Sequence, residues 1–266
     1  MHQIIDSHCH WDSPRLQALQ PDLWQSCVTQ GIGQLLVPGT QFSCFSRQIS
    51  LCNENPNWHL ALGLHPYFCD QHLPEHMLSL ESELAKPSTV TPVAVGEIGL
   101  DWALDIAQPA FSKPNQEQLF NAQVSLATQF GLPLVVHCRK ANDRMAQLLR
   151  QQKFANGGIV HAFSGSLQQA QAFTKLGFKI GLGGTLTYDR AQAMRRLAIA
   201  LPLTDIVLET DAPDMPMAGQ KKEAANRPDL LPHVLAILAQ IRPESAAAIA
   251  QQTRINTLKV LNLPLY

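Results

Sequence analysis

At 266 residues, with 45% hydrophobic and only 15% charged residues, the chain can bury a substantial core. Its formal net charge is −1 and it has no long basic run, which argues against a protein that holds a DNA duplex by neutralising its phosphates. No apolar run approaches the length needed to span a bilayer, so we expect neither export nor membrane anchoring, and a cytoplasmic location. The six cysteines form no C-x-x-C pair, and we expect reduced, semi-buried thiols.

Short β-type apolar runs alternate with amphipathic helical stretches along the chain, which predicts a parallel sheet with helical crossovers. The expected strands are Gln3–Asp6, Gln34–Pro38, Leu60–Gly63, Val93–Gly96, Leu134–Val136, Gly158–Val160, Phe178–Gly181 and Ile206–Glu209. The best-bounded helices are Gln116–Phe130, which stops at Gly131, Leu167–Leu176, between Ser166 and Gly177, and a last helix from about Pro243 to Leu261, expected on the outside.

Eight such strand–helix units predict the α/β class and a (β/α)8 TIM-type barrel. No linker, low-complexity tract or charge block divides residues 1–266, so we expect a single domain. Reactive groups in these barrels lie on the loops at the C-terminal ends of the strands. The same ends are therefore the place to look for chemistry.

Six side chains that can bind a metal follow the predicted strands. They are His8, His10, Glu97, His137, His161 and Asp211. A single histidine of this kind could equally be a hydrogen-bonded core residue, but the strand ends of a barrel converge. Four imidazoles and two carboxylates converging in this way predict a metal site, and an acid such as Glu97 that ends an apolar run must be paired or metal-bound if it is buried.

Two further acids share the parity of these ligands along their strands. Asp6 precedes His8 and His10 by even spacings, so it either orients an imidazole or simply closes the strand. Glu209 precedes Asp211 by two residues, and we expect it one layer deeper, supporting a ligand or a basic residue.

Several segments together resemble the TatD-type metal-dependent hydrolases, a family of the amidohydrolase superfamily of barrels. They are Asp6–His10, Gly63–Pro66, Gly96–Asp101, His137, His161–Gly165 and Glu209–Pro213, and the stretches Lys179–Gly184 and Asn226–Pro228 are most similar to the YjjV branch. The resemblance covers nearly the whole chain. It implies that His8, His10 and Asp211 hold one metal ion, that His137 and His161 hold another, and that Glu97 bridges them. The family includes DNases and exonucleases.

The hypothesis that follows is a hydrolase with two divalent ions, about 3.5–4 Å apart, that activate a water. Ligand chemistry leaves Mg²⁺, Mn²⁺ and Zn²⁺ open. Asp211 is predicted to accept the proton of that water.

Three more residues are predicted to meet the substrate. His65 is interpreted as a substrate contact or leaving-group acid, because it stands apart from the six ligands in sequence. Arg139 is expected to clamp a phosphate, with an ion pair to Asp101 or Glu209 as the alternative. Arg227 is expected at the mouth of the barrel.

These residues favour hydrolysis of phosphoester bonds, in short or single-stranded nucleic-acid ends. The same machinery could instead cut an amide, a lactone or an aminoacyl ester, since metal ions polarise carbonyl and phosphoryl oxygens alike. A third alternative is a non-catalytic metal-binding scaffold. That alternative predicts the loss of at least one ligand, whereas all six are present.

Overall fold

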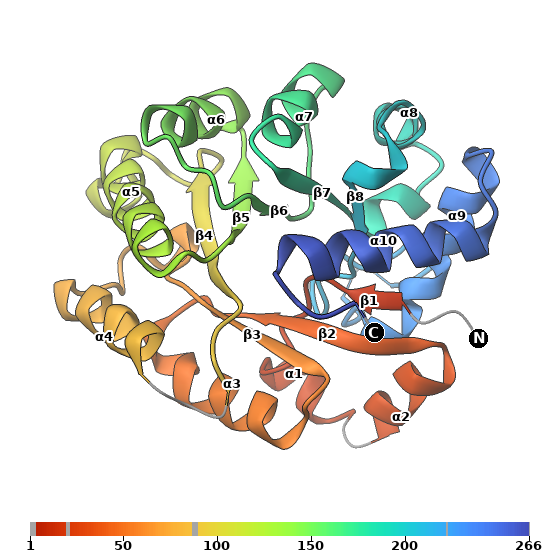
Figure 1. Cartoon of the computed structure of the whole chain (residues 1–266), viewed down its shortest axis with the longest axis horizontal. Coiled ribbons are helices and arrows are strands. Elements are labelled where there is room, and N and C mark those ends of the chain that lie inside the picture. Colours follow the sequence, from red (N-terminus) through yellow and green to blue (C-terminus); the bar gives the residue numbers. More distant parts are fainter. Residues whose placement is uncertain (1–3, 20–21, 87–89, 222, 266) are drawn as a thin grey trace.

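The computed structural model describes residues 4–19, 22–86, 90–221 and 223–265, and its centre is one eight-stranded parallel sheet (Figure 1). The strands follow one another in chain order around the sheet, as the alternating pattern predicts. They are β1 (Ile4–Asp6), β2 (Ile32–Pro38), β3 (Trp58–Leu62), β4 (Ala94–Asp101), β5 (Leu134–Arg139), β6 (Gly158–Val160), β7 (Phe178–Leu182) and β8 (Ile206–Leu208).

The first and last strands meet just beyond their C-terminal ends. The Ser7 backbone N–H donates to the Leu208 carbonyl at 2.9 Å, and Cys9 forms a parallel bridge with Ala212. These bonds bring the two edges of the sheet together, so the predicted (β/α)8 barrel is confirmed.

Helices surround the strands, as Figure 1 shows. The α-helices are α1 (Pro14–Gln17), α2 (Asp22–Thr29), α3 (Phe42–Glu54), α4 (Pro74–Ala85), α5 (Lys113–Phe130), α6 (Asn142–Gln151), α7 (Leu167–Thr174), α8 (Gln192–Ala200), α9 (Leu231–Ile241) and α10 (Ala246–Val260). Short 3₁₀ helices lie in the loops: η1 (Pro66–Phe68), η2 (Pro109–Phe111), η3 (Gly184–Thr187), η4 (Leu203–Asp205) and η5 (Pro228–Leu230). No helix in the described ranges combines the length and apolar character needed to cross a membrane.

The apolar core has two parts, because alternate residues of each strand face opposite sides. The larger part lies between the strands and the surrounding helices. The smaller part contains one residue from each of several strands, among them Ala61, Val135 and Val207, together with Val260 and Leu261 at the end of α10. The end of α10 therefore completes this second cluster. Because apolar side chains fill the interior of the barrel, the polar residues gather at the C-terminal rim.

The last helix thus lies differently from its prediction. It was expected on the outside, but α10 contacts β1, β7 and β8 and crosses one end of the barrel (Figure 1). Asn256 donates from Nδ2 to the carbonyls of Leu203 and Ile206, at 2.8 and 2.7 Å, where β8 begins. A helix that carries buried polar residues such as Asn256 can satisfy the free carbonyls of a strand start, a role that apolar periodicity does not reveal.

Two strands continue several residues past their predicted C-terminal ends. β4 continues through Asp101 and β5 through Arg139, where these two residues pair across the sheet. Glu97 and His137 therefore lie within strands and not after them. The predicted strands were ended at the first polar residue, but backbone hydrogen bonds between strands form regardless of side-chain polarity. The first predicted strand begins at Gln3, which lies outside the described residues.

Helix boundaries follow the local signals. Gly131 ends α5 in the left-handed conformation with φ 66°, as a residue without Cβ can. Ser166 caps α7 through a capping box with Gln169, although that helix ends at Thr174. The six cysteines are free thiols, as expected.

Candidate metal centre

The Glu97 carboxylate, buried on β4, is the centre of the predicted ligand cluster. Its Oε2 lies 3.1 Å from His8 Nε2 and 3.4 Å from His10 Nε2. Its Oε1 lies 2.8 Å from His161 Nε2 and 3.3 Å from His137 Nδ1. One oxygen thus faces the histidines that follow β1, and the other faces those of β5 and β6.

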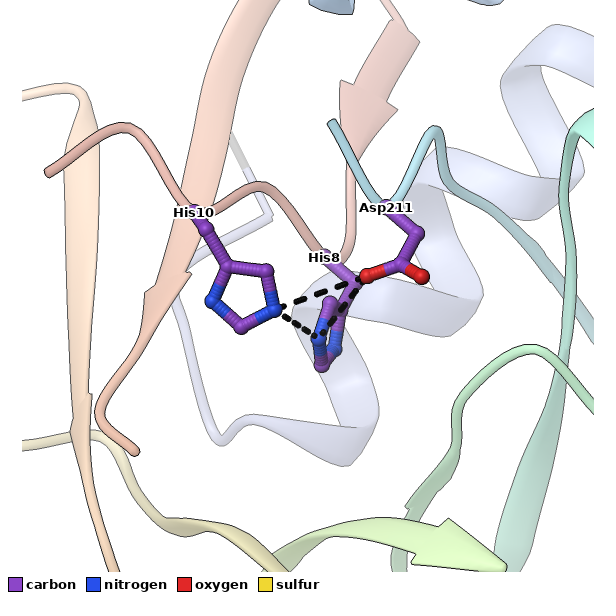
Figure 2. A group of neighbouring side chains, drawn as sticks. All are labelled: His8, His10 and Asp211. Carbon is purple, nitrogen blue, oxygen red and sulfur yellow. Dashed lines mark hydrogen bonds and ion pairs between the residues drawn. The ribbon is translucent and has the colours of Figure 1, made fainter. Parts of the chain in front are cut away.

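Asp211 completes the first of these two groups. Its Oδ1 lies 3.5 Å from His10 Nε2 and 3.7 Å from His8 Nε2, and Figure 2 shows the three side chains pointing toward one another. The second carboxylate oxygen points away from the two imidazoles in the same view. The Asp211 backbone N–H donates to the His8 carbonyl at 2.9 Å, so the junction of β1 and β8 brings this group together.

The structure brings His65 to the same cluster, although its place in the sequence suggested isolation. Its Nε2 lies 3.1 Å from Glu97 Oε1. Its Nδ1 accepts a hydrogen bond from the Tyr67 backbone N–H at 3.0 Å, so the proton of the neutral ring is on Nε2, which donates to Glu97. His72 Nε2 lies 2.9 Å from the His65 carbonyl oxygen and fixes the loop. The idea that His65 stands apart is corrected, while its role stays a prediction.

The buried charges of the cluster strongly perturb one another. Burial alone lowers the pKa of His161, but the charges of Glu97 and Asp211 outweigh it and raise that pKa to about 10. Burial also lowers the pKa of His10, yet its hydrogen bond to Asp211 and the charge of Glu97 raise it to about 9. For His8, burial and the neighbouring His161 lower the pKa to about 4.

The pKa values of the two carboxylates, Glu97 and Asp211, are both lowered. Burial raises the pKa of Glu97, but the surrounding imidazoles bring it well below its ordinary value. Burial likewise raises the pKa of Asp211, and hydrogen bonding to His10 with the nearby imidazoles lowers it overall. Positive charge therefore stabilises both carboxylates in their ionised form, the form that binds a cation.

These residues fit a divalent metal ion. Three donor groups each have ligand atoms within 4.8 Å of one another, and these groups are His8, His10 and Asp211; His8, Glu97 and His161; and His65, Glu97 and His137. The donors are imidazole nitrogens and carboxylate oxygens with no thiolate, a set suited to Zn²⁺, Mn²⁺ or Mg²⁺.

Sequence reasoning missed the role of Asp101. His137 presents Nδ1 to Glu97 and Nε2 to Asp101 Oδ2 at 3.2 Å, so the ring lies between two carboxylates. Gly99 pairs with His137 across the sheet, which places Asp101 on the diagonal next to this side chain. Asp101 follows Gly99 by two residues, so both face the same side of β4. The sequence shows this spacing, but the predicted strand ended at Gly96 and did not include Asp101.

The two additional acids support the backbone around the ligands. Asp6 accepts hydrogen bonds from the backbone N–H of His8 and from Thr210, and within the described ranges it forms no hydrogen bond with an imidazole, so it closes the strand. Glu209 is fully buried, accepts from the Ala162 backbone N–H and lies 3.8 Å from His161 Nδ1. Burial raises the pKa of both acids, to about 7 for Asp6 and about 8 for Glu209.

The two arginines lie in different surroundings. Arg139 is 64% exposed, with Nη1 3.8 Å from Asp101 Oδ2, so of the two carboxylates considered as its partner, Asp101 is the one it approaches. Arg227 forms a two-point pair with Asp229, which also accepts from Ser26 Oγ of α2. The guanidinium of Arg227 is thus held toward α2, and its contact with substrate stays a prediction.

Comparisons with known proteins agree with this geometry. The profile of the TatD related DNase family matches residues 5–262. The chain belongs to the TatD family. It is 40% identical over 263 residues to an uncharacterized metal-dependent hydrolase, YjjV, of Escherichia coli K12, covering 98% of this chain and 99% of that protein. It is 32% identical over 241 residues to the 3′-5′ ssDNA/RNA exonuclease TatD of Erwinia billingiae, covering 88% and 89%.

A solved structure shows the same relationship. The crystal structure of YjjV, a TatD homologue from Escherichia coli K12, superimposes with a TM-score of 0.92 at 39% identity, and the match covers 99% of each chain. The TatD family membership and the cluster around Glu97 together make this protein a metal-dependent hydrolase.

Proposed function

We propose that this hydrolase uses two divalent ions to cleave phosphoester bonds at the ends of short or single-stranded nucleic acids. The observation that carries the proposal is the division of the Glu97 carboxylate, because Oε2 faces His8 and His10 whereas Oε1 faces His137 and His161. A carboxylate between two imidazole groups is suited to bridging a pair of cations.

In this proposal His8, His10 and Asp211 would hold one ion, His137 and His161 the other, and Glu97 both. Bound ions would supply Lewis acidity and a water of lowered pKa. Asp211 would accept the proton of the attacking water through the oxygen that points away from the imidazoles in Figure 2. His65 is a neutral ring with its proton on Nε2, inside the cluster, where it would donate a hydrogen bond to the leaving oxygen as a substrate contact. A proton from solvent would then neutralise that oxygen, since a neutral imidazole does not give up its only ring proton.

The choice of a phosphoester rests on two supports. Relatives at 30 to 32% identity are named 3′-5′ ssDNA/RNA exonucleases. Arg139 presents an exposed guanidinium beside the cluster, and its planar fork suits a phosphate. The six free cysteines fit a reducing compartment, and we keep the cytoplasm as part of the proposal.

A substrate panel tests the proposal. Metal-depleted protein is reconstituted with Mn²⁺, Mg²⁺ or Zn²⁺ and assayed on labelled single-stranded DNA and RNA, on bis(4-nitrophenyl) phosphate, and on lactones and aryl amides. We expect metal-dependent release of mononucleotides and nitrophenol, both lost in Glu97→Gln. Activity on lactones or amides alone would overturn the phosphoester assignment. Full metal loading without hydrolysis of any substrate would revive the scaffold alternative.

A further inference from the structure

A large cavity lies beside the metal centre, on the side of β7 and β8. It has a volume of about 520 Å³, within the range of small-molecule sites, and is lined by Thr185, Tyr188, Arg190, Ala191, Met215 and Pro216. One wall is formed by η3 and the residues that follow it, and the other by the loop after β8.

The cavity adjoins the ligand cluster. A second, narrower cavity shares Thr185 and Met215 with the large one and is also lined by Asp211 and Glu209. The Asp214 backbone N–H donates to the Asp211 carbonyl at 2.8 Å, so the turn that carries a ligand leads directly into the wall at Met215. A chain whose phosphate lies at the cluster could therefore place its neighbouring unit in the large cavity.

The two walls are tied together. Tyr188 Oη donates to the Pro216 carbonyl at 2.7 Å, and the Ala218 backbone N–H donates to Thr187 Oγ1 at 2.9 Å. A Cβ on Gly184 would lie 2.7 Å from the Met215 carbonyl oxygen, so only glycine permits this close approach. The cavity is consequently a built feature of two loops joined by hydrogen bonds.

Its lining combines an aromatic ring, apolar side chains and one cation. The Arg190 guanidinium lies over the Tyr188 ring, 5.0 Å from its centroid. The adjacent acids are engaged elsewhere, since Asp189 pairs with Arg195 and Asp214 with Arg15. Among the described residues, no carboxylate forms an ion pair with Arg190, so its charge is available to a ligand.

We propose that this cavity is a substrate subsite for the nucleotide next to the scissile phosphate of a single-stranded nucleic acid. Arg190 binds the backbone phosphate of that nucleotide, and Tyr188, Met215 and Pro216 hold its base and sugar. The inference rests on the proposed function and adds the place where the substrate chain is gripped. The proposed subsite is also consistent with a net charge of −1, because one cation in the cavity binds the substrate phosphate and no extended basic surface is needed.

Binding of a labelled single-stranded DNA pentamer, followed by fluorescence anisotropy, tests the subsite without turnover. Arg190→Ala is expected to raise the Kd about tenfold. It should also reduce the slope of log K against log salt concentration by about 0.7, the value for one lost phosphate contact in a single strand. Arg196→Ala removes the same charge from an exposed position on α8 and should match the wild type. Equal Kd values for the two variants would overturn the proposal.

A second variant keeps the charge of Arg190 and fills the volume of the cavity. Ala191→Phe fills the cavity from the start of α8 and should weaken pentamer binding by a similar factor while leaving the salt slope unchanged. Wild-type affinity in this variant would show that the cavity takes no part in binding and would also overturn the proposal.

Kinetics separate this inference from the proposed function. Arg190→Ala should raise KM for the pentamer about tenfold, whereas KM for bis(4-nitrophenyl) phosphate, which has no second phosphate for Arg190 to bind, should change much less. If Arg190→Ala and Arg196→Ala have the same KM, the subsite fails and the phosphoesterase stands. If the wild type binds the pentamer through Arg190 but cleaves neither substrate, the proposed function fails and the binding site stands.

Discussion

Asp6 and Thr210 are joined by two hydrogen bonds across the closure of the barrel. Asp6 Oδ2 accepts from Thr210 Oγ1 at 2.6 Å, and Oδ1 accepts from the Thr210 backbone N–H at 3.0 Å. Asp6 Oδ1 also lies 3.2 Å from the His8 backbone nitrogen. One buried carboxylate therefore holds the backbone of both segments that carry the predicted ligands His8 and Asp211.

Thr210→Val should destabilise the protein by about 2 kcal/mol. Valine has the same shape but leaves Asp6 Oδ2 and the Ala212 backbone N–H, which donates to Thr210 Oγ1, without that partner in a buried place. Urea unfolding of metal-free protein measures the loss. Thr257→Val is the matched control, since this buried hydroxyl donates to the Thr253 carbonyl one turn earlier in α10, at 3.0 Å. Equal losses in the two variants would contradict a special role for the Asp6–Thr210 pair.

Asp101→Asn should weaken metal binding by roughly 10- to 100-fold, the effect typical of losing a residue that orients a ligand. Asn has one acceptor oxygen for two donors, the His137 Nε2 proton at 3.2 Å and the Ala103 backbone N–H at 2.9 Å, so its NH2 group would face one of these donors and His137 would lose its fixed orientation. Calorimetric titration with Mn²⁺ or Zn²⁺ measures the affinity.

Asp105→Asn provides a close control for this change. Both acids accept from a backbone N–H two residues ahead, Asp101 from Ala103 and Asp105 from Ala107, but Asp105 is exposed. Unchanged metal affinity in Asp101→Asn, or the same loss in both variants, would exclude Asp101 as the residue that positions His137.

The barrel and its six predicted ligands follow from two simple physical features. Strands buried on both faces are apolar throughout, so polar residues such as His137 and His161 are conspicuous where they occur. The parallel strands of a barrel all end at the same rim. Residues such as His8 and Asp211 therefore meet there, although 203 positions (211 − 8) separate them in the sequence.

Other features depend on packing that no local pattern records. The position of His65 against Glu97 depends on the curvature of the barrel between β3 and β4. The place of α10 follows from the need of β8 to satisfy its first carbonyls through Asn256. The large cavity is made by two loops, around Tyr188 and Met215, whose approach is set by Gly184. Such relationships between distant segments appear only in three dimensions.

Asp211→Asn should lower kcat by about 10²–10⁴ with most of the bound metal retained, because the amide keeps one oxygen for an ion and loses the base. Asn also tolerates the left-handed backbone at this position, where φ is 58°. Turnover of bis(4-nitrophenyl) phosphate and metal content by mass spectrometry are measured together. Asp214→Asn, exposed and paired with Arg15, is the control. Loss of metal along with activity in Asp211→Asn would assign Asp211 a structural role in place of proton transfer.

A histidine far from the ligands, His59 on β3, should make the protein sensitive to acid. Its Nε2 lies 2.9 Å from Gln34 Oε1, and burial lowers the pKa of His59 to about 4, below the ordinary 6.5. The unfolded chain therefore binds more protons than the folded one between these two pH values, and stability falls as pH decreases through this window and levels off below about 4.

The contribution of neutral His59 to the free energy of unfolding that is lost in acid is about 2 kcal/mol, after allowing for partial exposure of the ring. His59→Gln can keep the contact with Gln34 but cannot titrate, so its free energy of unfolding should fall by about 2 kcal/mol less than that of the wild type between pH 6.5 and 4.5. Urea unfolding across this range measures the difference. His233→Gln, at an exposed position of α9, should leave the acid dependence as in the wild type. A parallel pH profile in His59→Gln would mean that His59 is already protonated in the folded protein, or that other groups set the acid limb.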